Sequence, residues 1–181
     1  RTLMRFEYSP EIWVLQPTVG PRGDILYKND IGQVLLRATR MGGLTLFTGK
    51  RPTGASASLA GASAPIRLKA IGPVDLYRIL LGASARASRL SRHRISFDAE
   101  ATPASSTLIA DAAILSIMAM ERIVQRTDGA AMAARIQRVV IVEGRKPEVI
   151  LRAGTLLIAV TPSLGVAGRP SSDRIFAVAT K

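Results

Sequence analysis

The chain has 181 residues, of which 48% are apolar, and a formal net charge of +12 that rests on 20 arginines and 5 lysines against 13 acidic residues. The apolar content excludes wholesale disorder, and the length suits one domain. Because there is no cysteine, disulfide bonds, thiolate metal sites and a cysteine nucleophile are excluded. The charge favours anionic partners such as nucleic acid, acidic lipid head groups or acidic glycans, although a genome that prefers Arg codons, combined with a shortage of acids, explains it equally well.

The first quarter of the chain is predicted to form a β-meander. Its apolar and β-favouring runs are short, and glycine, proline, asparagine and aspartate separate them closely enough for tight turns. The expected strands are residues 11–18, 25–28, 33–40 and 44–48.

Gly42 and Gly43 separate the last two of these runs, and two interpretations compete for them. A phosphate-binding loop needs a glycine-rich turn that leads into a helix, and the following "LTLFT" is a poor helix former. We therefore expect a turn between two strands, with positive φ at one of the glycines. The next residues, 49–73, are rich in Gly, Ala, Ser and Pro and are predicted to be a flexible connection.

Two helices are expected in the middle of the chain. The first begins near Pro73 and runs to residue 92, with an apolar face formed by Leu76, Ile79, Leu80, Ala83, Ala87 and Leu90. The second, residues 107–126, is apolar over about two thirds of its circumference and is therefore predicted to be the most buried element.

The second half of the chain adds further strands. Residues 93–100 and 138–144 read as strands, residues 129–137 as a short helix, and residues 149–163 as a hairpin, whereas residues 165–181 give no clear type. The predicted fold is a single α+β domain over residues 1–181. In it a mostly antiparallel sheet, made of the N-terminal meander and the C-terminal hairpin, packs on the central helix and on the second, amphipathic one.

Residues for catalysis are scarce. His93, the single histidine, stands between two arginines, and no serine lies in a nucleophile-elbow motif. Asp111 is the best candidate carboxylate for a hydrolase, and Arg122 falls on the same helical face, but a polar residue at the border of the core explains Asp111 as well. The thirteen acids are scattered, apart from Asp98 and Glu100, and neither a metal site nor a cofactor is predicted.

The first helix carries arginines opposite its apolar face. Arg78, Arg86 and Arg89 share this face with Arg92, and His93 and Arg94 extend it, which gives a candidate anion-binding surface. Aromatic residues for base stacking and a helix-turn-helix motif are both missing, so nucleic acid would be bound through its backbone only. A solvated face that keeps the protein soluble is the competing interpretation.

Several segments resemble a known family. The segments "FEYSPEIWVLQPTVGPRGDILYKND", "VLLRATRMGGLTLFTGKRPTGASASLAG", "IVEGR" and "VTPSLGVAGRPSSDRI" are similar to an uncharacterised family of alphaproteobacterial proteins that is catalogued as a domain of unknown function. The resemblance implies export with an N-terminal signal sequence, hence a periplasmic or secreted location, and assigns no functional residues. An initial Arg in place of Met fits a processed chain.

Three hypotheses follow from the sequence. The first is a binding or structural domain of the cell envelope whose arginine-rich helix face recognises an anionic polymer or another envelope component. The second is a hydrolase that acts on an envelope substrate with a carboxylate such as Asp111. The third is a non-specific nucleic-acid binder. No segment qualifies as a transmembrane helix, because the most apolar one, residues 107–124, contains two acids.

Overall fold

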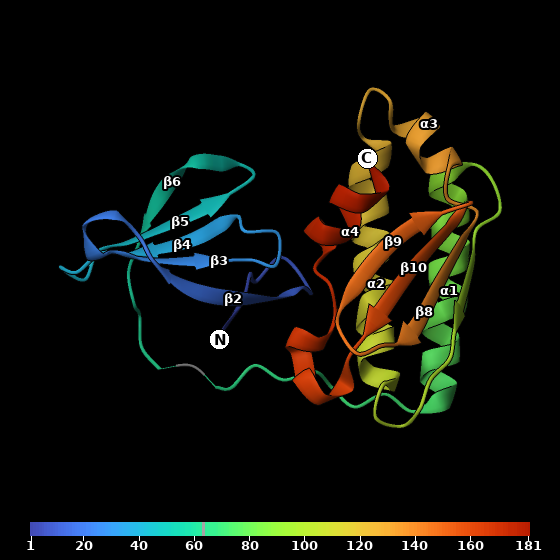
Figure 1. Ribbon diagram of the computed structural model, residues 1–181, viewed down its shortest axis with the longest axis horizontal. Coiled ribbons are helices and arrows are strands. Elements are labelled where there is room, and N and C mark those ends of the chain that lie inside the picture. The colour runs from blue at the N-terminus through green and yellow to red at the C-terminus, as the bar shows by residue number, and fades with distance from the viewer. Residues whose placement is uncertain (63) are drawn as a thin grey trace. The chain divides into compact units, whose positions relative to one another are not determined.

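The computed structural model describes residues 1–62 and 64–181 and divides the chain into two compact units. The N-terminal unit is Arg1–Arg67 and the C-terminal unit is Leu68–Lys181. The predicted single α+β domain is thus composed of two compact units, each with its own sheet (Figure 1).

The N-terminal unit is a six-stranded antiparallel meander in which every strand pairs with its neighbour in sequence. Its elements are β1 (Thr2–Arg5), β2 (Ile12–Val19), the 3-10 turn η1 (Pro21–Gly23), β3 (Ile25–Lys28), β4 (Val34–Ala38), β5 (Leu44–Thr48) and β6 (Arg51–Ala57). Buried apolar side chains in this unit include Ile12, Leu15 and Leu35. The predicted meander is confirmed, and it is extended by one strand at each end.

Two successive turns of the meander have the same design. In the β4–β5 turn the Thr39 amide donates to the Gly43 carbonyl at 2.8 Å, and the Thr39 hydroxyl accepts from the Gly43 amide at 2.9 Å. Asn29 does the same with Gln33 in the β3–β4 turn. Gly42 has φ +84, as a turn followed by a left-handed residue requires. The prediction of a strand–turn–strand is therefore confirmed, and no helix follows Gly43.

The prediction of a flexible connection over residues 49–73 is wrong for the first part of this segment. Arg51–Ala57 form β6, which pairs antiparallel with β5. The composition of this segment gave no strand signal. It still forms a strand, because pairing depends on backbone groups, which small and polar residues provide just as apolar residues do. Residue 63, which belongs to the same predicted connection, lies outside the described residues.

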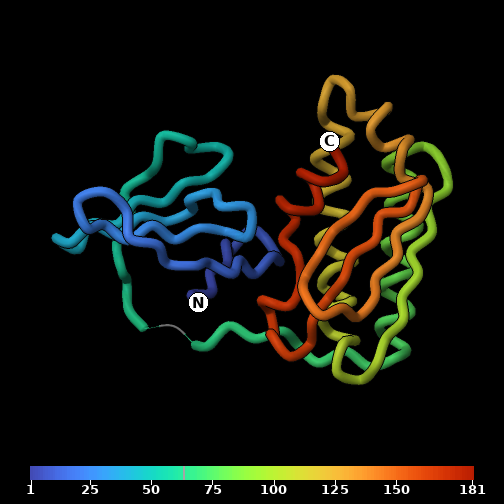
Figure 2. Tube along the Cα trace, viewed as in Figure 1, coloured from blue at the N-terminus to red at the C-terminus, as the bar shows by residue number. Residues whose placement is uncertain are grey.

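The C-terminal unit has two layers, a four-stranded sheet and helices that pack on one face of it (Figure 1). Its elements are α1 (Pro73–Ser91), β7 (Ser96–Ala99), α2 (Ser106–Val124), α3 (Gly129–Ala134), β8 (Arg138–Glu143), β9 (Glu148–Arg152), β10 (Thr155–Val160), the 3-10 segment η2 (Pro162–Gly168) and α4 (Ser172–Ala179). The strand order is β7-β8-β10-β9, so the chain passes from β8 to the edge strand β9 and returns through β10 to the centre (Figure 2).

The pairing in this sheet is mixed. β8 is parallel to both β7 and β10, whereas β9 and β10 form an antiparallel hairpin. The predicted α+β class with mostly antiparallel pairing is confirmed for the chain as a whole. The sheet that contacts α2, however, is the mixed one, because the link from β7 through α2 and α3 to β8 is long enough for a parallel crossover.

Helix α2 is central to the core, as predicted. Thirteen of its nineteen residues are buried, among them Ile109, Ile117 and Met120. It packs on α1, α3, α4, β8 and β10, which explains why its apolar surface extends around so much of the helix. Ile114 is 37% exposed, so the apolar surface of α2 is not buried all the way round.

Two arginine–aspartate pairs fasten the segment that contains α4 to α2. Asp111 of α2 accepts a hydrogen bond from the Arg169 guanidinium, and both side chains are buried. Arg122 of α2 donates to Asp173 of α4, and its guanidinium lies 4.5 Å from the centre of the Phe176 ring. Residues 165–181, whose secondary structure could not be predicted, thus contain the end of η2 and the helix α4, and the two ion pairs hold this segment against α2.

Candidate anion-binding site at one end of the C-terminal unit

Serines of α1 hold the segment that leads from α1 into β7. The Ser84 hydroxyl donates to the Ile95 carbonyl at 2.7 Å, and the Ser88 hydroxyl accepts from the Ile95 amide at 2.9 Å. The side chain of Ile95 is fully buried. Residues 92–94 therefore have a defined position beside the end of α1, although they lie outside any helix or strand.

His93 connects this segment to a distant part of the chain. Its Nε2 lies 2.8 Å from the carbonyl oxygen of Ile136, between α3 and β8, and its Nδ1 lies 3.1 Å from the carbonyl oxygen of Ser91. A carbonyl oxygen only accepts, so each ring nitrogen is directed at a backbone acceptor. This geometry assigns His93 a positioning role and leaves no ring nitrogen free to act as a general base or to bind an anion.

The His93 contact gathers four arginines. Arg89 of α1, Arg92 and Arg94 of the following segment, and Arg135 at the end of α3 are all exposed. In the part of the chain that the structure describes, none of the four forms an ion pair. We call this set the cationic end. Figure 1 shows α3 next to the C-terminal end of α1, and the two helices are in contact.

Two of the predicted arginines are not part of the cationic end. Arg78 lies near the start of α1 and pairs with Asp75 at 2.9 Å. Arg86 pairs with Glu121 of α2 and so lies along the seam between the two helices. Arg92, expected on the helix face, has φ +58 and ends α1 instead. The predicted stripe along α1 is therefore reduced to its C-terminal third.

Arg135 was missed by the sequence analysis. It follows the short α3 and precedes β8, and it lies more than forty residues from Arg94 along the chain. The parallel pairing of β7 with β8, in which Ser96 is the partner of Arg138, brings the two segments together. No local pattern carries this information, because the juxtaposition depends on the register of a parallel pair.

Two of the candidate carboxylates, Asp111 and Asp98, are engaged in ion pairs, whereas Glu100 is exposed. Asp111 is neutralised by Arg169 inside the protein. Asp98 accepts from the Arg138 guanidinium at 2.8 Å, a hydrogen bond that holds the pKa of Asp98 below its ordinary value, and Ser96 also donates to it. Among the described residues, no three acidic or histidine side chains come close enough to hold a metal ion.

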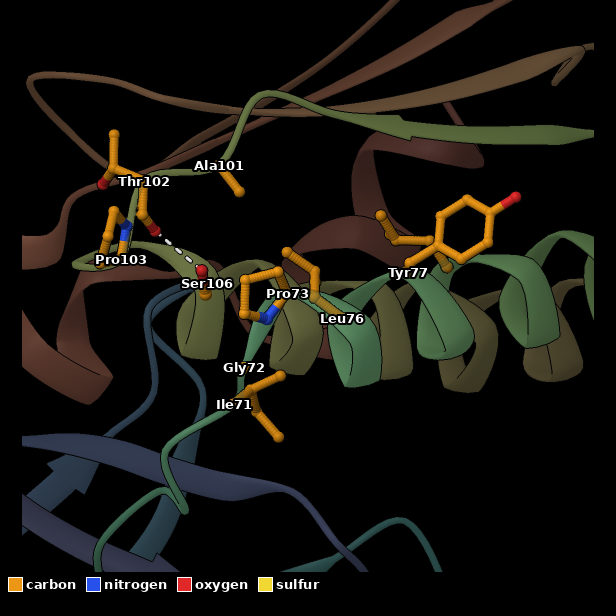
Figure 3. Close-up of a pocket in the computed structure, with 10 residues that line it drawn as sticks. Ile71, Gly72, Pro73, Leu76, Tyr77, Ala101, Thr102, Pro103 and Ser106 are labelled. Carbon is orange, nitrogen blue, oxygen red and sulfur yellow. Dashed lines mark hydrogen bonds between the residues drawn. The ribbon is translucent and has the colours of Figure 1, made fainter.

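A hollow of about 450 Å³ lies at the other end of the helix layer, where α1 and α2 begin. Its lining is mainly apolar, with Ile71, Leu76 and Leu80 among the residues (Figure 3). Thr102 and Ser106 contribute polar atoms, but the Ser106 hydroxyl already donates to the Thr102 carbonyl at 2.8 Å. Among the described residues, the lining of the hollow contains no charged side chain and does not include Asp111.

Glu143 lies close to this hollow through its contact with Thr102. The Thr102 hydroxyl donates to Glu143 Oε1 at 2.5 Å, and this hydrogen bond, with a second from Ser105, lowers the pKa of Glu143 below its ordinary value. The carboxylate is thus ionised and fixes the loop between β7 and α2 to the end of β8. The role of Glu143 is therefore to hold this loop in place.

The family model described as a domain of unknown function, DUF4908, matches residues 1–179. The chain belongs to DUF4908. The match covers both compact units and confirms the family membership that the quoted segments indicated. The comparison with curated proteins and the comparison with solved structures each returned no match for this DUF4908 domain. Within the described residues, its helices are too short or too polar to cross a membrane.

Proposed function

We propose that this DUF4908 domain binds an anionic polymer of the bacterial cell envelope through the cationic end. The observation that carries the proposal is the gathering of Arg89, Arg92, Arg94 and Arg135 at one end of the C-terminal unit, exposed and without ion pairs in the described residues. Among the described residues, eight basic side chains form ion pairs with acids, whereas the four arginines of the cationic end do not.

Guanidinium groups suit phosphate, sulfate and carboxylate ligands, because their planar donors form paired hydrogen bonds with such oxygens. The cationic end is spread over the end of α1 and two chain segments, so the repeated anionic groups of a polymer can reach more of its arginines than a single small ligand can. Each exposed contact is weak in water, so useful affinity needs several contacts at once.

The location outside the cytoplasm belongs to the same proposal. It is supported by the resemblance of the quoted segments to exported proteins, and the absence of cysteine is compatible with either redox environment. Fractionation of cells that express the complete gene tests it, with the protein expected in the periplasmic or secreted fraction.

The cationic end has a second role that needs to be separated from binding. The C-terminus of α1 carries a partial negative charge, and Arg89 in its last turn reduces that charge. This helix-end effect is worth at most about 1 kcal/mol at an exposed position. A stabilising role alone would change the melting temperature and leave polymer binding unaffected.

The test compares two triple variants of equal charge. The first is Arg89→Gln, Arg94→Gln, Arg135→Gln, which keeps side-chain size and leaves the left-handed Arg92 in place. The control is Arg5→Gln, Arg40→Gln, Arg51→Gln, three exposed arginines of the N-terminal unit that form no ion pair in the described residues. Binding to polyphosphate and to dextran sulfate is measured by fluorescence anisotropy as the salt concentration rises.

For the parent we expect the logarithm of the binding constant to fall with the logarithm of salt concentration with a slope of about −3, since four contacts release about 0.7–0.9 counterions each. The first variant should lose most of this slope, and the control should retain it. Equal loss in both variants would refute the site, because binding would then depend on net charge alone. A single-stranded oligonucleotide that binds much more tightly than both polymers would favour the nucleic-acid hypothesis instead.

A further inference from the structure

The two sheets have four edge strands, and three of them contain features that oppose pairing with another chain. β6 contains Pro52 and Gly54, β1 is four residues long with an arginine at its end, and β7 is four residues long with the charged Asp98. Short length, proline and charge are the usual protections of an exposed edge. β9, with the sequence EVILR, has no proline or glycine and carries its charges only at its two ends.

The backbone of β9 offers hydrogen-bonding groups to its open side. The turn to β10 consists of Ala153 and Gly154, both with positive φ, and Arg152 is the partner of Thr155. A two-residue turn of this kind is flanked by a hydrogen-bonded pair, and such pairs alternate along an antiparallel ladder. Residues 148, 150 and 152 therefore bond to β10, and the amides and carbonyls of Val149 and Leu151 are directed away from it.

The sequence of β9 is complementary to itself when the second strand runs in the opposite direction. If Ile150 lies opposite Ile150 of another copy, Val149 lies opposite Leu151, and Glu148 lies opposite Arg152. The outward-directed groups of Val149 and Leu151 then meet in about four backbone hydrogen bonds. Opposite charges directly across an antiparallel pair stabilise it, and this register places one such pair on each side of the centre.

The outer face of the sheet fits the same arrangement. Ile150 is 42% exposed, although it is apolar, and it shares a row with Leu157 and Val140, which are both only partly buried. Pairing would extend this row across the joint, so that the two Ile150 side chains cover one another. Val149 and Leu151 are directed toward the helix layer, where α4 packs against β9.

We propose that β9 pairs antiparallel with β9 of a second copy of this chain, centred on Ile150, and joins two four-stranded sheets into one of eight strands. The contact is a single five-residue edge, below the size of standard interfaces, which bury about 1,200–2,000 Å². Dimerisation is consequently weak and dependent on concentration. It is independent of polymer binding, because no residue of the cationic end takes part.

The test is sedimentation velocity of the full chain over a wide range of concentration, at about 0.15 M salt, where a Debye length of about 8 Å screens the repulsion between two basic proteins. The mass should rise from that of the 19.3 kDa monomer toward twice that value. Ile150→Lys places two like charges face to face and should weaken dimerisation at least tenfold. Ile31→Lys, in the β3–β4 turn and 45% exposed, is the matched control and should dimerise as the parent does.

A charge exchange tests the register. Glu148→Arg alone and Arg152→Glu alone each place like charges opposite one another and should weaken the dimer, whereas the double variant restores opposite charges and should recover the parent behaviour. Hydrogen exchange supplies the backbone evidence, since the amides of Val149 and Leu151 should slow in the concentration range in which the mass rises.

Three results would overturn the proposal. One is a parent chain that stays monomeric throughout, which includes the case in which β9 is covered within its own chain. Another is a dimer that is as stable with Ile150→Lys as without it, because the contact would then lie elsewhere. The third is a double charge exchange that recovers no more association than either single variant, which would exclude this register.

Discussion

Removing one member of the Asp111–Arg169 pair should destabilise the C-terminal unit more than removing any exposed ion pair of the chain. The side chains of Asp111 and Arg169 are only 10% and 2% exposed, so water cannot replace a lost partner. Asp111→Asn keeps the shape and an acceptor oxygen but leaves the Arg169 guanidinium charged and buried without the carboxylate of Asp111. Such a change costs about 3–5 kcal/mol, against at most about 1 kcal/mol for an exposed pair.

Arg169→Met should cost at least as much, because Arg169 makes further contacts beyond the one with Asp111. The double variant Asp111→Leu, Arg169→Met removes both charges together. Replacing a buried ion pair with apolar residues of similar volume is often close to neutral. The double variant should therefore be more stable than either single variant, with a coupling free energy of about 2 kcal/mol or more.

The assay is urea denaturation followed by circular dichroism, with the free energy of unfolding taken from the midpoint and the slope. A matched comparison is Asp75→Asn, which breaks the exposed pair with Arg78 on α1. If Asp111→Asn changes the free energy of unfolding no more than Asp75→Asn does, the pair behaves as a solvated one, and the account of how α4 is fastened to α2 is wrong.

Three further predictions concern the core, the turns and the pH dependence. Ile117→Asp places an unpaired charge on the buried side of α2 and should lower the free energy of unfolding by about 3–5 kcal/mol, and a variant that melts like the parent would contradict the core assignment. Gly42→Ala should lower the free energy of unfolding by about 1–2 kcal/mol, because Gly42 has a φ of +84. Gly82→Ala, in the exposed middle of α1, should raise it by about 1 kcal/mol, because alanine is the better helix former. Equal effects of the two variants on the denaturation midpoint would refute this distinction. The hydrogen bond from Arg138 lowers the pKa of Asp98 in the folded protein, and this half-exposed pair contributes less than about 1 kcal/mol of stability at neutral pH. The contribution is lost as the pH falls through the lowered pKa of the folded state. The difference in melting temperature between Asp98→Asn and the parent should therefore disappear in strong acid rather than grow.

Local patterns of the sequence were sufficient for most of the elements. The 3.6-residue period located α1 and α2, and it placed Asp111 and Arg122 on one face of α2. Both side chains do face the same neighbour, the segment that contains α4. Their partners Arg169 and Asp173 were not predicted, because a helical wheel gives the direction of a side chain and says nothing about which distant segment occupies that direction.

The errors arose where structure depends on tertiary contacts. β6 has no alternation of apolar and polar residues, and it forms because β5 offers it a row of backbone groups. The candidate site shows the same limit. The period of α1 identified Arg89, but the left-handed residue at Arg92 and the contact of His93 with the 134–137 segment decided which other arginines lie near it. The helix face was thus predicted, and the composition of the cationic end was not.

The order of strands in the C-terminal unit has a consequence for synthesis on the ribosome. β10 is the last strand to be made, and it lies between β8 and β9, which are made earlier. The sheet therefore stays incomplete until residues 155–160 have left the ribosome. In the N-terminal unit each strand pairs with the one made just before it, so each hairpin can close as it emerges. A nascent chain thus carries a closed meander ahead of a half-built sheet whose β8 still exposes an unpaired edge, and this edge is where a growing chain is most open to pairing with the wrong strand.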